Sequence, residues 1–206
     1  MTTLPPARAA SALIDGPAGA LEIAFHAPEQ PAALALICHP HPVHGGTMDN
    51  KVVQTLAKAF AELGCATLRF NFRGVGKSAG AFDDGIGETE DAAAALLWAR
   101  AQVPSSLPLI AAGFSFGCFV QSRLLPRSQP QQLVLVGPAV SRFQLAGVPQ
   151  DTLVIHGEAD DVVPLDAVMA WARPQGLPVT VFPGTGHFFH GRLTELKAVV
   201  KRNCRI

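Results

Sequence analysis

Short apolar runs alternate with longer stretches of helical character along most of the chain. Two short strands, predicted near 12–15 and 20–26, are expected to form an antiparallel pair. Further strands are predicted near 33–39, 66–72, 107–113, 132–136, 152–156 and 178–182, and helices near 50–63, 87–102, 116–125, 165–173 and 190–202. This alternation predicts an α/β protein with a mostly parallel, twisted sheet of about seven or eight strands, flanked by helices and joined by right-handed crossovers.

The composition is that of one globular domain spanning residues 1–206. Hydrophobic residues make up 49% of the chain and charged residues 16%, while 16 basic and 16 acidic residues balance to zero formal charge. Without a basic stripe or a polybasic run, we expect neither nucleic acid nor a membrane surface as a partner. No apolar run reaches the ~18 residues of a spanning helix, and residues 1–8 do not resemble a signal peptide.

Four cysteines occur, at positions 38, 65, 118 and 204, without metal or redox spacing. Three of them lie in or beside predicted strands and a helix, so they are interpreted as small buried apolar residues in a reducing compartment. A cytoplasmic location is therefore expected. The sequence does not decide the oligomeric state, which is expected to be a monomer or a homodimer.

The most informative motif is Gly113-Phe-Ser-Phe-Gly117, which lies between a predicted strand and a predicted helix. This is the strand–turn–helix context of a G-x-S-x-G nucleophile elbow. Glycine is favoured on both sides because the turn is too tight for a Cβ. The turn would expose the hydroxyl of Ser115 above the sheet, with a helix N-terminus aimed at a developing oxyanion.

A nucleophilic serine needs a base and a group that orients the base, and both candidates follow strands. His187 comes in the loop after the strand predicted at 178–182, where open α/β sheets place active sites, and is preferred over His190, which is expected to start the last helix. Asp160, Asp161 and Glu158 follow the strand predicted at 152–156. One of the two aspartates is expected to hold the imidazole, and the other could cap the next helix.

The order serine, acid, histidine is that of the α/β-hydrolases, and the chain resembles this superfamily from about Ala12 to its C-terminus. It is similar to small, uncapped bacterial serine hydrolases of the dienelactone-hydrolase and esterase-like branch, through the segments at 39–53 and 73–80. The family motif His-Gly-x-x-Asp-x-x-Val-Pro is matched at positions 156, 157, 163 and 164. The resemblance therefore assigns the acid to Asp160 rather than Asp161.

The oxyanion hole is expected to consist of two backbone N–H groups. One is that of Phe116, the residue after the nucleophile, and the other comes from the loop after the strand predicted at 33–39. Pro40 and Pro42 carry no N–H, which leaves His41 as the candidate donor.

Three further residues, Phe114, Arg73 and His44, are candidates for lining the substrate pocket. The alternatives are that Phe114 or Phe116 only packs in the core, and that Arg73, like Arg69, only ties loops together.

Two other motifs suggest ligands, and both fail. His39, His41 and His44 are close together, but no further Asp or Cys stands at a convincing ligand spacing beside them, so no metal is expected. The stretch Gly74-Val-Gly-Lys-Ser78 ends like a P-loop, yet position 71, where the pattern needs glycine, is Asn71. Neither a nucleotide nor any other cofactor is expected.

Only 15 residues, Gly137 to Asp151, separate the strand at 132–136 from the next. This is too short for a helical cap, so we expect an open site for a small-molecule acyl substrate. The sequence predicts a serine hydrolase that cleaves small carboxylic esters through an acyl-enzyme, with Ser115, His187 and Asp160 as the triad. A thioesterase, lactone hydrolase or short-peptide peptidase on the same scaffold, or a binding protein without catalysis, are the alternatives.

Overall fold

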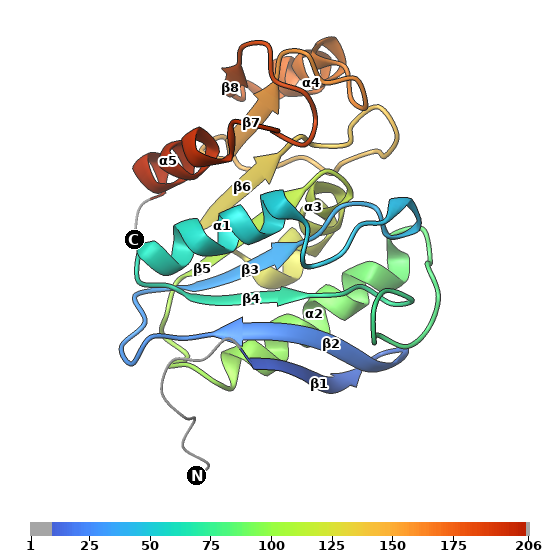
Figure 1. Ribbon diagram of the computed structural model, residues 1–206, viewed down its shortest axis with the longest axis vertical. Helices are drawn as coiled ribbons and strands as arrows, with labels where there is room; N and C mark the ends of the chain where they lie inside the picture. Colours follow the sequence, from blue (N-terminus) through green and yellow to red (C-terminus); the bar gives the residue numbers. More distant parts are fainter. Residues whose placement is uncertain (1–9, 205–206) are drawn as a thin grey trace.

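The computed structural model describes residues 10–204, which contain one sheet of eight strands in the order β1-β2-β4-β3-β5-β6-β7-β8 (Figure 1). The strands are β1 (Ala10–Gly16), β2 (Gly19–His26), β3 (Leu34–Cys38), β4 (Ala66–Phe70), β5 (Leu109–Phe114), β6 (Gln132–Val136), β7 (Leu153–Gly157) and β8 (Val179–Phe182). β2 runs antiparallel to both β1 and β4, and every other pair of neighbours is parallel. The predicted α/β fold and the antiparallel opening pair are confirmed.

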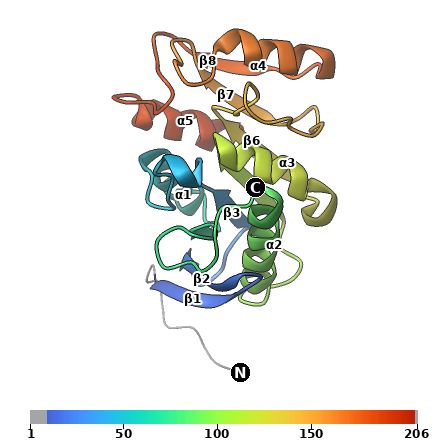
Figure 2. The same ribbon diagram turned by 90° about the vertical axis from the view of Figure 1, so that its right-hand side faces the viewer.

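The helices cover both faces of the sheet (Figure 2). They are α1 (Lys51–Glu62), α2 (Ile86–Arg100), α3 (Phe116–Ser128), α4 (Leu165–Ala172) and α5 (Leu193–Asn203). α1 and α5 lie on one face, and α2 and α3 lie on the other. The prediction that His190 starts the last helix is wrong. Phe189 and Gly191 have φ of 53° and 74°, so the backbone is left-handed there and the helix begins later.

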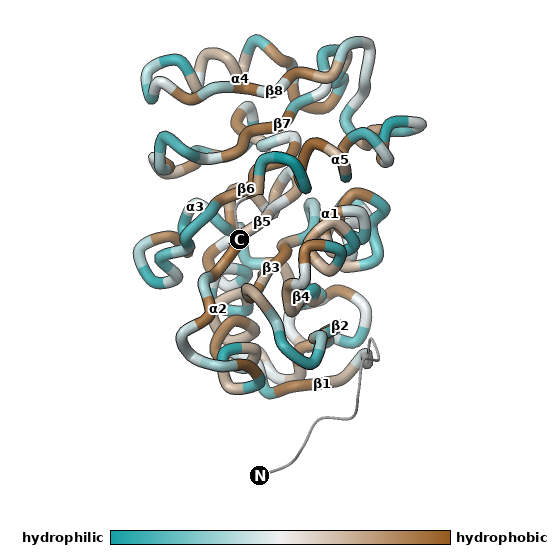
Figure 3. Tube along the Cα trace, turned by 90° about the vertical axis from the view of Figure 1, so that its left-hand side faces the viewer, coloured by the Kyte–Doolittle hydropathy of each residue, from teal (hydrophilic) through white to brown (hydrophobic). Residues whose placement is uncertain are grey.

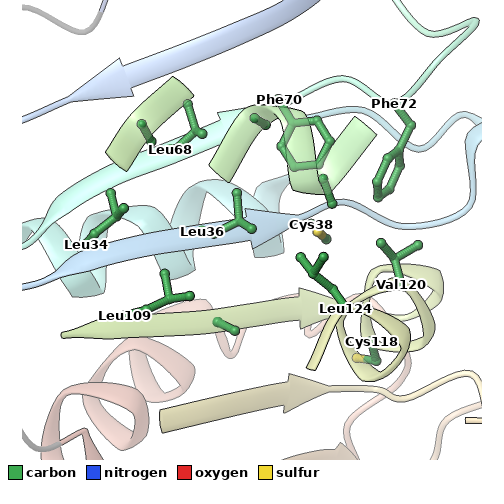
Figure 4. Close-up of a cluster of buried hydrophobic side chains, with 14 of the residues drawn as sticks. Leu34, Leu36, Cys38, Leu68, Phe70, Phe72, Leu109, Cys118, Val120 and Leu124 are labelled. Carbon is green, nitrogen blue, oxygen red and sulfur yellow. The ribbon is translucent and has the colours of Figure 1, made fainter. Parts of the chain in front are cut away.

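The core divides into two layers because strand side chains alternate between the faces. Leu34, Leu36 and Cys38 of β3 point toward α2 and α3, where Figure 4 shows them with apolar side chains of β4, β5 and α3. Ala35 and Ile37 of the same strand point toward α1 and α5. Since both faces are covered, the central strands are apolar along their whole length (Figure 3).

The parallel strands β3, β4, β5, β6, β7 and β8 all end at one edge of the sheet, so the loops that follow them gather there. The segment between β6 and β7, residues 137–152, contains no helix and no strand. The prediction of a fold without a cap is therefore confirmed, and the edge stays open. Within residues 10–204, none of the helices has the length and apolar character needed to cross a membrane.

Candidate active site

Ser115 occupies the sharp turn between β5 and α3. Its φ and ψ are 55° and −114°, a conformation that L-residues rarely adopt and that is held by hydrogen bonds on both sides. Its N–H donates to the carbonyl of Val136 at 2.9 Å, and its own carbonyl accepts from Cys118 at 3.0 Å. The flanking glycines are required sterically, because a Cβ at Gly117 would fall on the carbonyl oxygen of Cys38 and one at Gly113 would collide with the backbone of Gly117.

His187 lies in the loop after β8 and reaches the serine. Its Nε2 is 3.0 Å from Oγ of Ser115, and both side chains are largely buried. The ring packs against Phe114, with centroids 5.0 Å apart. Gly137, at the end of β6, leaves space for it, since a Cβ there would lie 3.2 Å from the imidazole.

Asp160, in the loop after β7, is the carboxylate that the fold brings to His187. Its Oδ2 is 2.7 Å from Nδ1 of the imidazole, while Oδ1 accepts backbone N–H groups from Val162 and Val163 at 2.9 and 2.7 Å. The two alternatives lie elsewhere. Asp161 is exposed, and Glu158 accepts an N–H from Gly184 at 2.8 Å, which ties the histidine loop to the end of β7.

The environment of Asp160 keeps this carboxyl ionised. Burial alone would raise its pKa, but the hydrogen bonds from His187 and from the Val163 N–H more than offset this effect, so the pKa lies below its ordinary value. Behind it lies His156, whose Nε2 is 2.9 Å from the carbonyl of Val163 and 3.4 Å from Oδ2 of Asp160. Burial lowers the pKa of His156, so this imidazole stays neutral. The site therefore holds one buried negative charge, directed at His187.

The two expected oxyanion donors lie beside the nucleophile. Phe116 is the first residue of α3, and no residue of the described part of the chain accepts a hydrogen bond from its N–H or from that of His41. The loop of His41 is positioned by His39, whose Nδ1 donates to the carbonyl of Pro40 at 2.6 Å and whose Nε2 accepts the N–H of Phe72 at 3.0 Å. Because C=O and N–H point to opposite sides of a trans peptide, anchoring the Pro40 carbonyl directs the His41 N–H away from His39.

The buried His39 predicts a dependence of stability on pH. Burial lowers the pKa of this imidazole from 6.5 to about 3. Between those values the unfolded chain binds a proton that the folded protein does not, so stability falls as the pH decreases below 6.5. From about pH 7 to about pH 5, His39 should account for a loss of about 2 kcal/mol in the free energy of unfolding.

Urea unfolding at a series of pH values measures this dependence. The His39→Gln variant should be less stable at neutral pH and should have a flatter dependence on pH. His41 and His156, whose pKa values burial also lowers, supply the remaining slope in both proteins. Equal slopes in the wild type and the variant would contradict the assignment.

A cavity of about 290 Å³ opens over Ser115 and His187. Its walls are Pro40, His41, His44, Gly45, Gly46, Asn50, Phe116, Ala139, Arg142, Phe143, Val162, Val163 and Phe188. His44 lies in this wall, as expected, and the residue Phe116 also contributes to it.

Two pocket expectations need correction. Phe114 does not line the cavity, because its side chain is fully buried on the α1 and α5 side of the sheet and packs against His187. Arg73 does not line it either, because its guanidinium is bound by Asp91 at 2.9 and 3.1 Å and lies 3.8 Å from Asp83. This arginine ties the loop after β4 to α2, which was the alternative interpretation.

The three neighbouring histidines do not act as one set of ligands. Both ring nitrogens of His39 are already engaged by backbone groups, whereas the rings of His41 and His44 pack with centroids 4.7 Å apart. In the part of the chain that is described, no group of three His, Cys, Asp or Glu side chains is placed to hold a metal ion.

Four residues that line the cavity had no role of their own assigned from the sequence: Asn50, Arg142, Phe143 and Phe188. Arg142 and Phe143 lie after β6 in the loop at 141–148, which the sequence indicated as a segment that shapes specificity, without singling out either side chain. Asn50 lies within the 39–53 segment that carries the resemblance, and Phe188 directly follows His187.

A lidless, mostly parallel sheet with a serine elbow at its carboxyl edge defines the chain as an α/β-hydrolase fold of the serine-hydrolase type. Solved structures with this architecture are closely similar. An α/β serine hydrolase without a lid from Xanthomonas campestris is 40% identical with a TM-score of 0.91, covering 98% of this chain and 96% of that one. An α/β serine hydrolase homologue from Coxiella burnetii is 42% identical with a TM-score of 0.88, covering 99% and 100%.

The family is also shown at the level of sequence. A family model described as serine aminopeptidase, S33, matches residues 41–146. A relative from Rickettsia prowazekii, described as an uncharacterized protein, is 32% identical over 201 residues, which is 90% of this chain and 84% of the relative. The chain thus belongs to this serine-hydrolase family of the α/β-hydrolase superfamily.

Proposed function

We propose that the protein hydrolyses small carboxylic esters through an acyl-enzyme, with Ser115, His187 and Asp160 as its catalytic triad. The observation that carries this proposal is the continuous hydrogen-bonded chain from Ser115 Oγ through the imidazole to Asp160, with distances of 3.0 and 2.7 Å. Nucleophile and base are within the reach that proton transfer requires, and a third group orients the base.

In the acylation step, Ser115 Oγ attacks the ester carbonyl carbon and His187 Nε2 takes the hydroxyl proton. Asp160 accepts the Nδ1–H and stabilises the imidazolium that forms. The carbonyl electron pair moves onto oxygen, where the N–H groups of Phe116 and His41 stabilise it. Collapse of this intermediate breaks the bond to the leaving alkoxide, which receives the proton from His187.

Deacylation repeats these events with water as the nucleophile. His187 Nε2 takes a proton from the water, the hydroxide attacks the acyl carbon, and Ser115 Oγ leaves with the proton returned to it. The open edge of the sheet gives water access to the acyl-enzyme. The cavity, at about 290 Å³, suits a small acyl group rather than a long lipid.

The description of the family model makes an aminopeptidase the second candidate. An enzyme of that kind must recognise a free α-ammonium group, and a carboxylate is the side chain that binds such a cation strongly. Among the described residues that line the cavity there is no aspartate and no glutamate. This lining favours an ester substrate over a peptide with a free amino terminus.

Labelling with a fluorophosphonate probe tests the proposal at the level of chemistry. The wild-type protein should incorporate one probe, located at Ser115 by peptide mass spectrometry. The Ser105→Ala variant, which removes an exposed serine far from the motif, should be labelled to the same extent. A panel of short esters, thioesters, lactones and aminoacyl anilides then ranks the substrates, with p-nitrophenyl acetate expected above the anilides. No labelling and no turnover would instead indicate a binding protein on this scaffold.

A further inference from the structure

The cavity over Ser115 has one permanently charged side chain in its wall, that of Arg142. The other walls are apolar or aromatic, or carry neutral polar groups and histidines. Arg142 is exposed at the rim, while Phe116, Val163 and Ala139 are buried at the base. A ligand in this cavity therefore has an apolar environment for its body and a cation at one end.

The guanidinium of Arg142 is free to bind a ligand. Among the described residues, no hydrogen bond or ion pair engages it, in contrast to Arg73 and Arg127, which are bound to Asp91 and Glu90. Arg202, exposed on the outer surface, also has no hydrogen-bond or ion-pair partner among the described residues, but it does not line this cavity. An unpaired cation in the wall of a catalytic cavity is a means of binding an anion.

The backbone that carries Arg142 is held firmly, which makes the cation a positioned one. The N–H groups of Arg142 and Phe143 both donate to the carbonyl of Ala139, at 3.1 and 3.0 Å. The ring of Phe143 stacks on Phe119 with centroids 4.9 Å apart, and it contacts Phe116 at 5.1 Å. The backbone at Arg142 is thus fixed against α3, next to the nucleophile, while the long arginine side chain stays mobile.

The charges around the cavity agree with an anionic ligand. Burial and then the neighbouring His44 and Arg142 lower the pKa of His41, which lies in the oxyanion loop, while Asp84 raises it. The opposing carboxylate in that environment is Asp84, which is exposed and is not part of the wall. A cationic substrate would be repelled by Arg142 and would find no carboxylate to bind.

We propose that the substrate is a small ester with an apolar body and a carboxylate on one of its two halves, and that Arg142 binds this carboxylate. The inference rests on the proposed esterase function and adds the substrate class. The anion and the scissile carbonyl would be held at opposite ends of one small cavity, which fixes the orientation of the substrate.

Matched ester pairs test this proposal. The first pair, p-nitrophenyl hemiadipate and p-nitrophenyl hexanoate, has the same acyl length and differs in a carboxylate on the acyl half. The second pair, 3-acetoxybenzoate and its methyl ester, places the carboxylate on the leaving half. In the wild type, kcat/KM should favour the anionic member of at least one pair, and the pair with the larger preference identifies the half that Arg142 binds.

The Arg142→Gln variant should lower this anion-to-neutral ratio about tenfold, mainly through KM, because a charge-assisted hydrogen bond is lost. Arg142→Lys should keep part of the ratio, since it retains the charge but not the planar fork. Arg202→Gln, which removes the same charge elsewhere, should match the wild type. Salt at about 1 M should reduce the ratio in the wild type. A ratio that Arg142→Gln leaves unchanged in both pairs would overturn the proposal.

Failure of this inference is distinguishable from failure of the proposed function. Hydrolysis of the neutral esters without any preference for the anionic ones would refute the binding of a substrate carboxylate by Arg142. The proposed esterase function would still be supported. If no ester is hydrolysed and the fluorophosphonate does not react, calorimetric titration with adipate decides. Adipate binding that Arg142→Gln abolishes would support the anion site alone, and absence of binding to the wild type would refute it.

Discussion

Replacing Ser115 with alanine is expected to lower kcat/KM for p-nitrophenyl acetate by on the order of 10⁵-fold, to the level left by the oxyanion donors and binding alone. The variant removes Oγ of Ser115, the protein atom that forms the bond to the acyl carbon, so no acyl-enzyme forms. The hydroxyl makes one hydrogen bond, to His187, and the strained turn around it is held by backbone groups. The fold should therefore survive the change.

A burst experiment with p-nitrophenyl acetate measures the expected loss of acyl-enzyme formation. Urea unfolding measures whether the fold survives. The wild type should release one equivalent of p-nitrophenolate per protein before steady state if deacylation is the slower step, and Ser115→Ala should show no burst. The midpoint of unfolding should stay close to that of the wild type, as should that of Ser105→Ala. Full activity in a well-folded Ser115→Ala protein would refute the serine mechanism.

The fold, and the juxtaposition of Ser115, His187 and Asp160, could be predicted from the sequence because their signals are local. A strand that ends in Gly113-Phe-Ser-Phe-Gly117 and continues as a helix leaves few other conformations, since Gly117 has the carbonyl of Cys38 where a Cβ would be. His187 and Asp160 follow apolar strands, and parallel strands bring their ends together whatever lies between them. These features depend on short stretches of chain and on the topology of the sheet.

The pocket could not be predicted in the same way, because its walls depend on which side of the sheet each side chain faces. Phe114 and Phe116 flank the nucleophile symmetrically in the sequence, yet Phe114 ends β5 and is buried on one face while Phe116 begins α3 and reaches the cavity. Arg73 is held by Asp91, which lies 18 residues away on α2. Arg142 lies in an irregular segment without any motif, and only the folded arrangement brings it to the cavity.

The residue types and spacing alone left Asp160 and Asp161 both open, since the two are adjacent and chemically identical, and only the resemblance to the family motif selected Asp160. The structure separates them by burial, because Asp160 is 6% exposed and Asp161 faces solvent. Asp160→Asn and Asp161→Asn remove the same charge one residue apart, so the two variants form a matched pair.

Asp160→Asn should lower kcat by about 10⁴-fold at neutral pH, whereas Asp161→Asn should stay within about twofold of the wild type. In the wild type, Oδ1 of Asp160 accepts the N–H groups of Val162 and Val163, and Oδ2 faces His187 Nδ1. In the variant, the amide oxygen must stay on the two N–H groups, which turns the amide NH₂ toward the imidazole.

An amide donor facing Nδ1 forces that nitrogen to accept, so the proton of a neutral His187 moves to Nε2. This tautomer donates toward Ser115 and cannot take its proton, and the imidazolium would lose its buried counter-charge. Measurement of kcat/KM with p-nitrophenyl acetate for the two variants decides between the aspartates. A large loss in Asp161→Asn together with an active Asp160→Asn would transfer the orienting role to Asp161, whereas the expected result assigns it to the carboxylate that His187 already contacts.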